Sequence, residues 1–254
     1  VSASRSEKDE SDFGLMGGKQ IYIPAYFLNS SNFLSKFLMR LIALPDPSIL
    51  WARKTYREIE SDFNKYKIDV ILTSSPPHGI QYLGVLLAER FCVPYVADFR
   101  DDFLTNHRVK WRTPLHRWAA EKLEKRVLET ARLVITNTQV IQNRFQDRYP
   151  QYKSKIITVS NGYDEDDFNG LGGERHIGTR SRIVYLGGDY NGFSPKIISD
   201  IAAQLIRLGL SNDWAIHTAG SGNWEDSVKN YDFWIHHGLL SQRDTNELMD
   251  TADI

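Results

Sequence analysis

Residues 69–79 read DVILTSSPPHG, and residues 93–102 read VPYVADFRDD. Each segment is a short apolar run that ends in polar or turn-forming residues, which is typical of a buried strand followed by a loop. A helical pattern over residues 80–91 separates the two runs. A strand, a helix and a second strand in this order predict two parallel strands joined by a crossover helix.

The same alternation extends in both directions from this segment. An amphipathic pattern places Phe33, Phe37 and Leu41 on one helical face, and Pro45 ends that helix. We expect a short strand at 20–26, helices at 32–44, 48–65, 118–131 and 139–149, and strands at 133–136 and 156–159.

A second series of strands and helices follows a segment rich in glycine and polar residues, 170–181, where we place a domain boundary. We expect strands at 182–186, 214–219 and 231–236, helices at 195–208 and 242–251, and the start of a strand at 252–254. The sequence therefore predicts an α/β protein with domains at 1–172 and 180–254. Both domains are expected to be truncated, the first lacking its opening strand and helix.

Composition excludes several classes of protein. The net charge of the 254 residues is -1 and the isoelectric point is near 6.7, so no basic field exists to bind nucleic acid. The single cysteine, Cys92, excludes a disulfide framework and a multi-cysteine zinc site, and it favours a reducing, cytoplasmic location. Apolar runs are shorter than the ~20 residues of a transmembrane helix, so any membrane contact is expected to be peripheral.

Four segments together resemble a known family. They are residues 69–77, 93–102, 124–138 and 161–164, the last reading NGYD. Their order and spacing resemble the retaining GT-B glycosyltransferases of the family 4 type. The resemblance is strong over residues 69–167 and weak over residues 182–254. It implies two Rossmann-like domains, the first binding an acceptor and the second a nucleotide-sugar donor.

The resemblance also implies an activity and a setting. The expected function is transfer of a sugar from a nucleotide sugar to a glycan or lipid-linked acceptor in cell-surface polysaccharide or lipopolysaccharide biosynthesis. No metal ion or other cofactor is expected, and the expected location is cytoplasmic, associated with the inner face of the membrane. In the family, the segment matching Asn161, Gly162 and Asp164 lies at the crossover between the domains.

Two departures from the family pattern leave alternatives open. Many members have a His-Asp pair where this chain has Arg100 and Asp101, and the family's Glu-x7-Glu segment would follow Ile254. The given fragment is therefore expected to be inactive alone. One alternative is a non-catalytic nucleotide- or sugar-binding scaffold derived from a transferase. A second is a GT-B nucleotide-sugar epimerase.

The candidate catalytic residues follow the predicted strands. Ligands of open parallel sheets bind at the carboxyl ends of the strands. The Arg100 guanidinium could stabilise phosphate charge there, and Asp101 could accept a hydrogen bond from an acceptor hydroxyl. A structural salt bridge from Arg100 to Asp98 or Asp101 is the alternative. His78 is a candidate hydrogen-bonding or acid-base group, or else a solvated loop residue.

The candidate donor-binding residues lie in the second domain. Gly187 and Gly188 follow its first strand, where backbone amides can approach phosphates without a side chain in the way. Lys196 lies where relatives place a basic residue against the donor phosphates, with a solvated helix lysine as the alternative. Gly220 and Gly222, which follow His217 on the next predicted strand, resemble a family Gly-x-Gly loop.

Two segments are candidates for contact with an anionic membrane or a lipid-diphosphate acceptor. The first is the amphipathic helix at 32–44. The second is basic and aromatic, and comprises His107, Arg108, Lys110, Trp111, Arg112, His116 and Arg117. A helix that covers the core and a solvated surface are the respective alternatives.

Overall fold

The computed structural model describes residues 43–105, 111–171, 180–189 and 193–254. The strand predicted at 20–26 and the first eleven residues of the helix predicted at 32–44 lie outside these ranges. Residues 107–110 of the basic segment also lie outside them.

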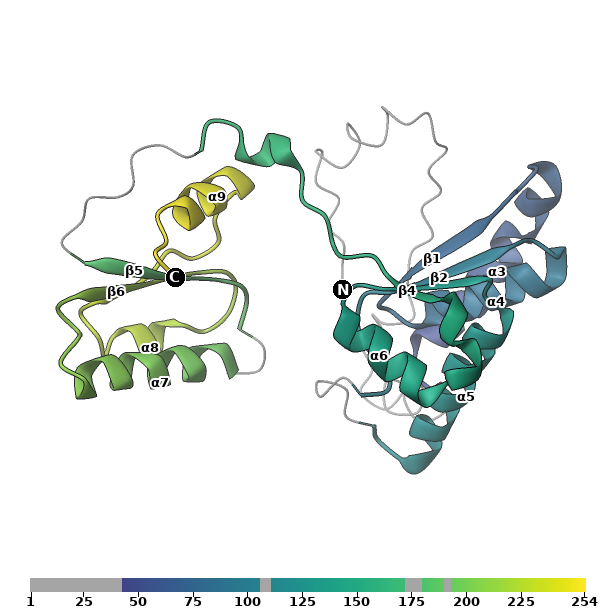
Figure 1. Cartoon of the computed structure of the whole chain (residues 1–254), viewed down its shortest axis with the longest axis horizontal. Helices are drawn as coiled ribbons and strands as arrows, with labels where there is room; N and C mark the ends of the chain where they lie inside the picture. The colour runs from purple at the N-terminus through teal and green to yellow at the C-terminus, as the bar shows by residue number, and fades with distance from the viewer. Residues whose placement is uncertain (1–42, 106–110, 172–179, 190–192) are drawn as a thin grey trace. The chain divides into compact units, whose positions relative to one another are not determined.

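Backbone contacts divide the chain into two compact units, residues 1–161 and 162–254. We call them unit 1 and unit 2 (Figure 1). The division falls between Asn161 and Gly162, ahead of the glycine-rich segment. The reason is that the turn which follows Gly162 packs within unit 2. That turn, η3 (Glu165–Phe168), is held by a 2.7 Å hydrogen bond from Asn246 Nδ2 to the Asp167 carbonyl.

The described residues of unit 1 form a four-stranded parallel sheet in the order β1-β2-β3-β4. Its strands are β1 (Ile71–Ser75), β2 (Tyr95–Phe99), β3 (Leu133–Thr136) and β4 (Ile156–Thr158). Its helices are α3 (Ser48–Lys65), α4 (Gly79–Phe91), α5 (Pro114–Thr130) and α6 (Gln139–Arg148), followed by the 3-10 turn η2 (Pro150–Lys155). The predicted parallel α/β sheet is confirmed.

Helix α5 begins four residues earlier than its apolar pattern predicts. Thr113 is its N-cap, with the hydroxyl accepting from the backbone amide of His116, and Pro114 occupies the first turn. A capping threonine followed by proline is a strong helix start, because the hydroxyl satisfies a free amide and proline needs none. The pattern failed here because Leu115, the apolar side chain that follows the proline, is 53% exposed.

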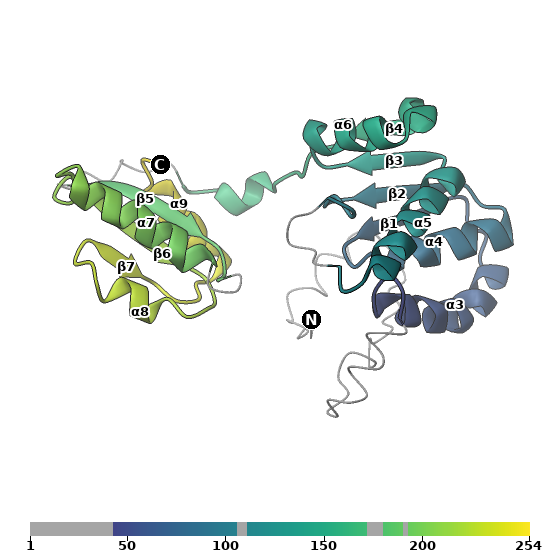
Figure 2. The same cartoon turned by 90° about the horizontal axis from the view of Figure 1, so that it is seen from below.

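The helices of unit 1 pack on one face of the sheet (Figure 2). Burial alternates along β1, with Ile71 and Thr73 buried and Leu72 65% exposed. Alternation of this kind puts successive side chains on opposite faces. Tyr95, Phe99 and other buried residues of the covered face form the core with α4 and α6.

Unit 2 is a three-stranded parallel sheet in the order β5-β6-β7. Its strands are β5 (Ser181–Leu186), β6 (Trp214–Ala219) and β7 (Trp234–His236), and its helices are α7 (Phe193–Arg207), α8 (Glu225–Val228) and α9 (Gln242–Asp250). The short helix α8 was not predicted. Its neighbour Trp224 is fully buried and packs with Trp234 and Ile198 in the core of the unit.

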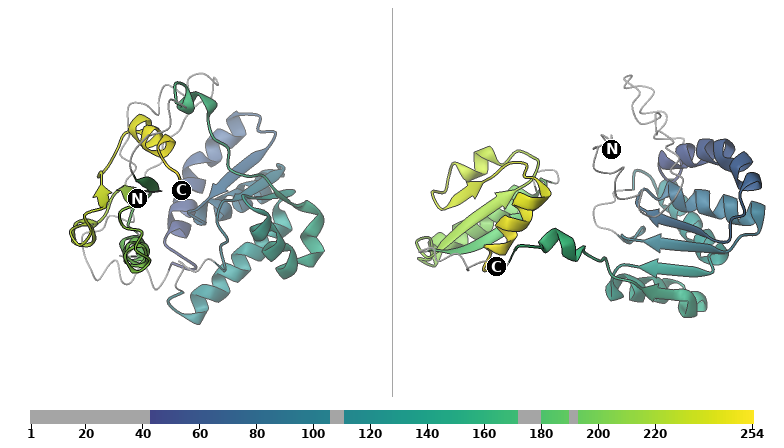
Figure 3. Two further views of the ribbon diagram at one scale, coloured as in Figure 1. Left: turned by 60° about the vertical axis from the view of Figure 1, so that its left-hand side comes forward. Right: turned by 90° about the horizontal axis from the view of Figure 1, so that it is seen from above.

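The chain returns to the sheet of unit 2 at its last residues. The amides of Asp253 and Ile254 donate to the Arg182 carbonyl at 2.9 and 3.2 Å, and the Val184 amide donates to the Ile254 carbonyl at 3.0 Å. These bonds lie along β5, as expected for the predicted start of a strand at 252–254. Figure 3 shows the two units from further directions. None of the helices in the described ranges is long and apolar enough to cross a membrane.

Replacing Gly220 by alanine is expected to destabilise unit 2. Gly220 has φ +139°, and a Cβ atom built there would lie 2.1 Å from the Gly187 carbonyl oxygen. The strained backbone alone costs about 1–3 kcal/mol, and the clash with backbone adds to it. We expect Gly220→Ala to lower the melting temperature measured by circular dichroism. Gly162→Ala is the control, since its Cβ meets nothing within 4 Å; equal melting of the two variants would contradict the packing described.

Candidate functional site

The carboxyl ends of β1 and β2 bring Ser74, Asp98 and Arg100 together. Ser74 and Asp98 are register partners, and the Ser74 hydroxyl donates to Asp98 Oδ2 at 2.7 Å. Arg100 Nε lies 3.2 Å from Ser74 Oγ and 3.4 Å from Asp98 Oδ2. The Arg100 backbone is fixed as well, because its amide donates to the Ser75 carbonyl at 3.0 Å.

The Arg100 side chain forms an ion pair with Asp98, one of the two salt bridges given as the alternative, and still faces solvent. Its side chain is 57% exposed, whereas that of Asp98 is 16% exposed. An exposed pair of this kind contributes little to stability, with a typical value of about 0–1 kcal/mol. Arg100 engages these partners through Nε, so the far edge of its guanidinium is available to an anionic ligand.

Asp101 is exposed and takes part in no hydrogen bond or ion pair with the described residues. It therefore does not form the salt bridge with Arg100 that the sequence left open. Its carboxylate remains available to a ligand hydroxyl.

His78 is buried, so the alternative of a solvated loop histidine is wrong. Its ring lies 3.9 Å from the Phe103 ring and 6.2 Å from that of Phe99, measured between centroids. Burial lowers the pKa of His78 to about 4, with Asp102 opposing the shift. The imidazole is neutral at pH 7, and its buried Nδ1 has no hydrogen-bond partner in the described part of the chain. Hydrogen bonding suits this group better than proton transfer near neutral pH.

A buried charge network begins at Asp102, the residue after Asp101, and it was not predicted from the sequence. Arg148 of α6 donates through Nη2 to Asp102 Oδ1 at 3.1 Å and through Nε to Glu124 Oε1 of α5 at 3.1 Å. The carboxylates are 3% and 0% exposed. The guanidinium also lies over the Phe145 ring, 4.8 Å from its centroid. One cation thus joins the loop after β2 to two helices.

The two carboxylates of this network have opposite pKa shifts. Burial raises the pKa of Glu124 to about 7, although the charge of Arg148 opposes the shift. Burial also acts to raise the pKa of Asp102, but hydrogen bonds from Thr105 and Arg148 prevail and lower it. Asp102 is therefore the permanently charged partner of Arg148.

Gln81 of α4 is a second buried polar residue that connects the strand ends. Its amide nitrogen donates to Ser75 Oγ at 2.9 Å and to the Asp98 carbonyl at 2.7 Å. Its amide oxygen accepts from Thr73 Oγ1 at 2.6 Å and from the Tyr95 hydroxyl at 2.5 Å. A fully satisfied buried network rigidifies its surroundings, so the ends of β1 and β2 are held at a fixed spacing.

In unit 2, the predicted glycines form two loops that pack against each other. The loop after β5 contains Gly187 and Gly188, and the loop after β6 contains Gly220 and Gly222. The Gly187 amide donates to the Ala219 carbonyl at 2.9 Å. Gly222 has φ +129°, and a Cβ there would lie 2.3 Å from Asp189 Cβ. Gly220 and Gly222 are therefore required by packing within the loops, whatever ligand the loops bind. A Cβ at Gly187 or Gly188, in contrast, would have side-chain oxygens as its nearest atoms, at 3.1 and 3.0 Å.

The remaining candidates of unit 2 lie on α7 and β6. Lys196 is exposed in the first turn of α7 and forms no ion pair with the described residues. His217 is buried, and its Nδ1 lies 2.9 Å from His237 Nε2, so these two rings share a hydrogen bond. No group of three or more histidine, cysteine or acidic side chains in the described ranges is placed to hold a metal ion.

The predicted hinge residues are exposed at the point where the two units divide. Asn161 and Gly162 flank the division. Asp164 caps the η3 turn, with Oδ1 accepting from the Asp166 amide at 3.0 Å.

Replacing Glu124 by glutamine tests the buried network. Its pKa of about 7 exceeds the ordinary 4.5, so between these pH values the folded state binds more protons and the free energy of unfolding falls as pH rises. We expect wild type to lose more stability than Glu124→Gln between about pH 5 and about pH 8, because glutamine cannot ionise. Urea unfolding at both pH values measures the difference; parallel pH profiles would show that Glu124 titrates normally.

Solved structures with a similar fold align with most of this chain. A UDP-GlcNAc 2-epimerase from Methanocaldococcus jannaschii aligns over 97% of this chain and 67% of its own, with a TM-score of 0.52 and 15% identity. The MnaA structure from S. aureus with UDP aligns over 88% of this chain and 58% of its own, with a TM-score of 0.45 and 11% identity. The first likeness is to a GT-B-type protein and confirms the α/β, Rossmann-like fold class.

Comparison with curated proteins gave no match. The family model described as Glycosyltransferase Family 4 matches residues 35–167. This match takes in the strands of unit 1, the Arg100 loop, the Asp102 network and the Asn161 segment. Because it covers just over half of the chain, the chain belongs to Glycosyltransferase Family 4.

Proposed function

We propose that the protein to which this chain belongs transfers a sugar from a nucleotide-sugar donor to a glycan or lipid-linked acceptor. The observation that carries the proposal is the family match over the segment that presents Arg100 and Asp101 at the carboxyl ends of parallel strands. Ligands of such sheets bind at this edge. In unit 1 the loop at this edge carries charged residues, and in unit 2 the loops at this edge are rich in glycine.

In the proposed reaction, an acceptor oxygen forms a bond to the anomeric carbon while the bond from that carbon to the diphosphate breaks. The nucleoside diphosphate leaves with the electron pair and takes up the acceptor's proton, with retention of anomeric configuration. Arg100 stabilises the negative charge that develops on the leaving diphosphate. Asp101 accepts from an acceptor hydroxyl, and neutral His78 contributes a hydrogen bond.

The donor is proposed to lie against unit 2. Gly187 and Gly188 lack the side chains that would keep a phosphate from the backbone amides. Lys196 supplies a positive charge to the phosphates, since no described carboxylate pairs with it. The proposal includes no metal ion, so turnover should be unchanged by EDTA.

The test is nucleotide release by the full-length protein from a panel of nucleotide sugars, with Arg100→Ala as the variant. We expect one donor to raise the melting temperature by mass action and Arg100→Ala to reduce turnover at least about tenfold, because a stabilising charge is lost. Arg90→Ala is the matched control, since Arg90 is also an exposed arginine paired with one carboxylate, Glu60, at 3.3 Å. Equal turnover of the two variants would show that Arg100 has no part in the reaction.

The same assay separates the alternatives. A transferase releases free nucleoside diphosphate, whereas an epimerase returns an epimeric nucleotide sugar with the nucleotide attached. A scaffold binds a nucleotide or sugar and produces neither product. If no nucleotide shifts the melting temperature of the full-length protein, donor binding itself is disproved.

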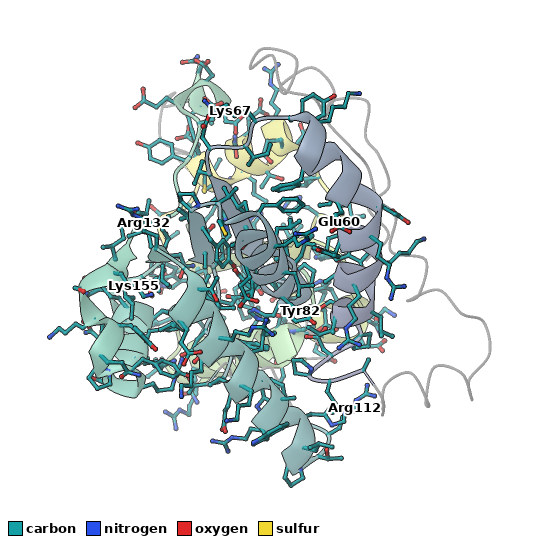
Figure 4. The ribbon with its side chains drawn as sticks, turned by 90° about the vertical axis from the view of Figure 1, so that its right-hand side faces the viewer. Glu60, Lys67, Tyr82, Arg112, Arg132 and Lys155 are labelled. Carbon is teal, nitrogen blue, oxygen red and sulfur yellow. The ribbon has the colours of Figure 1, made fainter. Side chains whose placement is uncertain are left out.

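We also propose peripheral contact between unit 1 and the inner, anionic face of a membrane, where a lipid-linked acceptor for surface polysaccharide would be met. Leu115 and Trp118 are 53% and 54% exposed on the first turns of α5. Arg112 precedes this helix, and Figure 4 shows its side chain on the same side of unit 1 as Tyr82. Tyr82 lines a pocket of about 180 Å³ together with three cations, Arg53, Lys122 and Arg126. Exposed aromatic and basic side chains together favour an anionic interface.

Trp118→Ala is expected to weaken binding to vesicles that contain anionic phospholipid, because the indole would no longer enter the interface. Val140→Ala is the matched control, since Val140 is an exposed apolar residue of another helix, α6. Co-sedimentation with anionic and with neutral vesicles measures both variants. Equal binding of wild type to the two kinds of vesicle, or no loss in Trp118→Ala, would contradict the proposal.

A further inference from the structure

We propose that Asp102 is a positioning residue of the candidate site, held by Arg148 so that the loop after β2 presents Arg100 and Asp101 in one conformation. The inference rests on the proposed function, because it assigns Asp102 a part in the same site. Asp102 itself does not face the site, being 4% exposed.

The Asp102 side chain closes the loop on itself. Its Oδ1 accepts from the backbone amides of Leu104 and Thr105, each at 3.1 Å, and its Oδ2 accepts from the Thr105 hydroxyl. A single carboxylate therefore organises the residues that follow it. Three donors of the loop depend on these two oxygen atoms.

Arg148 then ties the closed loop to α6. Its Nη2 and Nη1 lie 3.1 and 3.4 Å from Asp102 Oδ1 and Oδ2, so the two groups meet in a two-point contact. Arg144, one turn earlier on α6, adds a cation 3.9 Å from Oδ2. Two-point guanidinium–carboxylate contacts fix orientation as well as distance. The loop is consequently held by a helix outside its own strand pair.

Arg100 and Asp101 lie between two fixed points of the backbone. On one side, the Arg100 amide is bonded to the Ser75 carbonyl at the end of β1. On the other side, Asp102 is bonded to Arg148. Asp101 is the one residue between these points, so loss of the second point would release its carboxylate and the backbone that follows Arg100.

The third candidate residue depends on the same anchor. Phe103 follows Asp102, is itself buried, and covers the His78 ring at a centroid distance of 3.9 Å. Asp102 thus precedes the residue that buries His78 and follows the two that face solvent. One buried carboxylate adjoins all three proposed catalytic positions.

Glu124 provides a matched comparison, because it is the other carboxylate bound to Arg148. It lies on α5 and is also fully buried, but its side-chain hydrogen bonds are to Arg148 and Tyr149 and not to the loop. Removing either carboxylate leaves Arg148 with one partner. Only removal of Asp102 frees the loop.

The experiment compares Asp102→Asn with Glu124→Gln in the full-length protein, with Glu89→Gln as a surface control. Glu89 forms a two-point pair with Arg126 on the helix surface, at 3.0 and 2.5 Å. In Asp102→Asn, we expect kcat for nucleotide release to fall at least about tenfold, because displacement of catalytic groups by about 1 Å has effects up to about 100-fold. The donor KM and the donor-induced melting shift should change less than about twofold, because the donor is proposed to bind unit 2. Glu124→Gln and Glu89→Gln should keep wild-type kcat.

Hydrogen exchange gives a readout that does not require activity. The amides of Leu104 and Thr105 should exchange at least about tenfold faster in Asp102→Asn than in wild type and Glu124→Gln, because the anchor of their acceptor is lost. If exchange and kcat follow overall stability equally in both variants, Asp102 is merely structural and the proposal is overturned. If wild type turns over no donor, the proposed function fails, and the exchange comparison alone decides whether Asp102 positions the loop.

Discussion

The pairing of Arg148 with Asp102 is the constraint on which the candidate site depends. Three charged groups are removed from water in unit 1, and such burial is tolerated only when geometry and hydrogen bonds compensate for lost hydration. Here the guanidinium donates to both carboxylates, while burial raises the pKa of Glu124 to about 7. Asp102, whose pKa is lowered by its hydrogen bonds, stays charged near neutral pH, and its pair with Arg148 holds the loop after β2. The stability of α5 and α6 and the geometry of the site are linked through one side chain.

This arrangement separates the groups that shape the site from those that face a ligand. Asp102 and Gln81 are buried and hydrogen-bonded to neighbouring residues, and Phe103 is buried against the His78 ring. Arg100 and Asp101, in contrast, are exposed at the strand ends. Preorganised charge stabilises a developing negative charge at little reorganisation cost, which is the kind of help that departure of a diphosphate requires. In unit 2 the fixed groups are backbone, because a side chain at Gly220 or Gly222 would collide with the loop after β5.

Much of the fold could be predicted from the sequence, because strand and helix periodicity is a local property. The bounds of β3 and β6 were predicted as they are observed, and those of α3 likewise. The start of α5 was missed because a threonine cap, and not an apolar residue, begins it. Arg148 and Glu124 were missed because each has the pattern of an ordinary helical residue, and only the packing of α5 beside α6 makes them partners. The burial of His78 was missed for the same reason, since Phe103 covers it from another loop.

A double-mutant cycle between Asp102 and Arg148 tests the central claim most directly. The free energy of unfolding in urea would be measured for wild type, Asp102→Asn, Arg148→Met and the double variant. A desolvated, two-point pair predicts a coupling energy of about 2 kcal/mol or more, because either single change leaves a buried charge without its partner. A coupling energy below about 0.5 kcal/mol, as for an exposed pair, would contradict the claim that this contact fixes the loop.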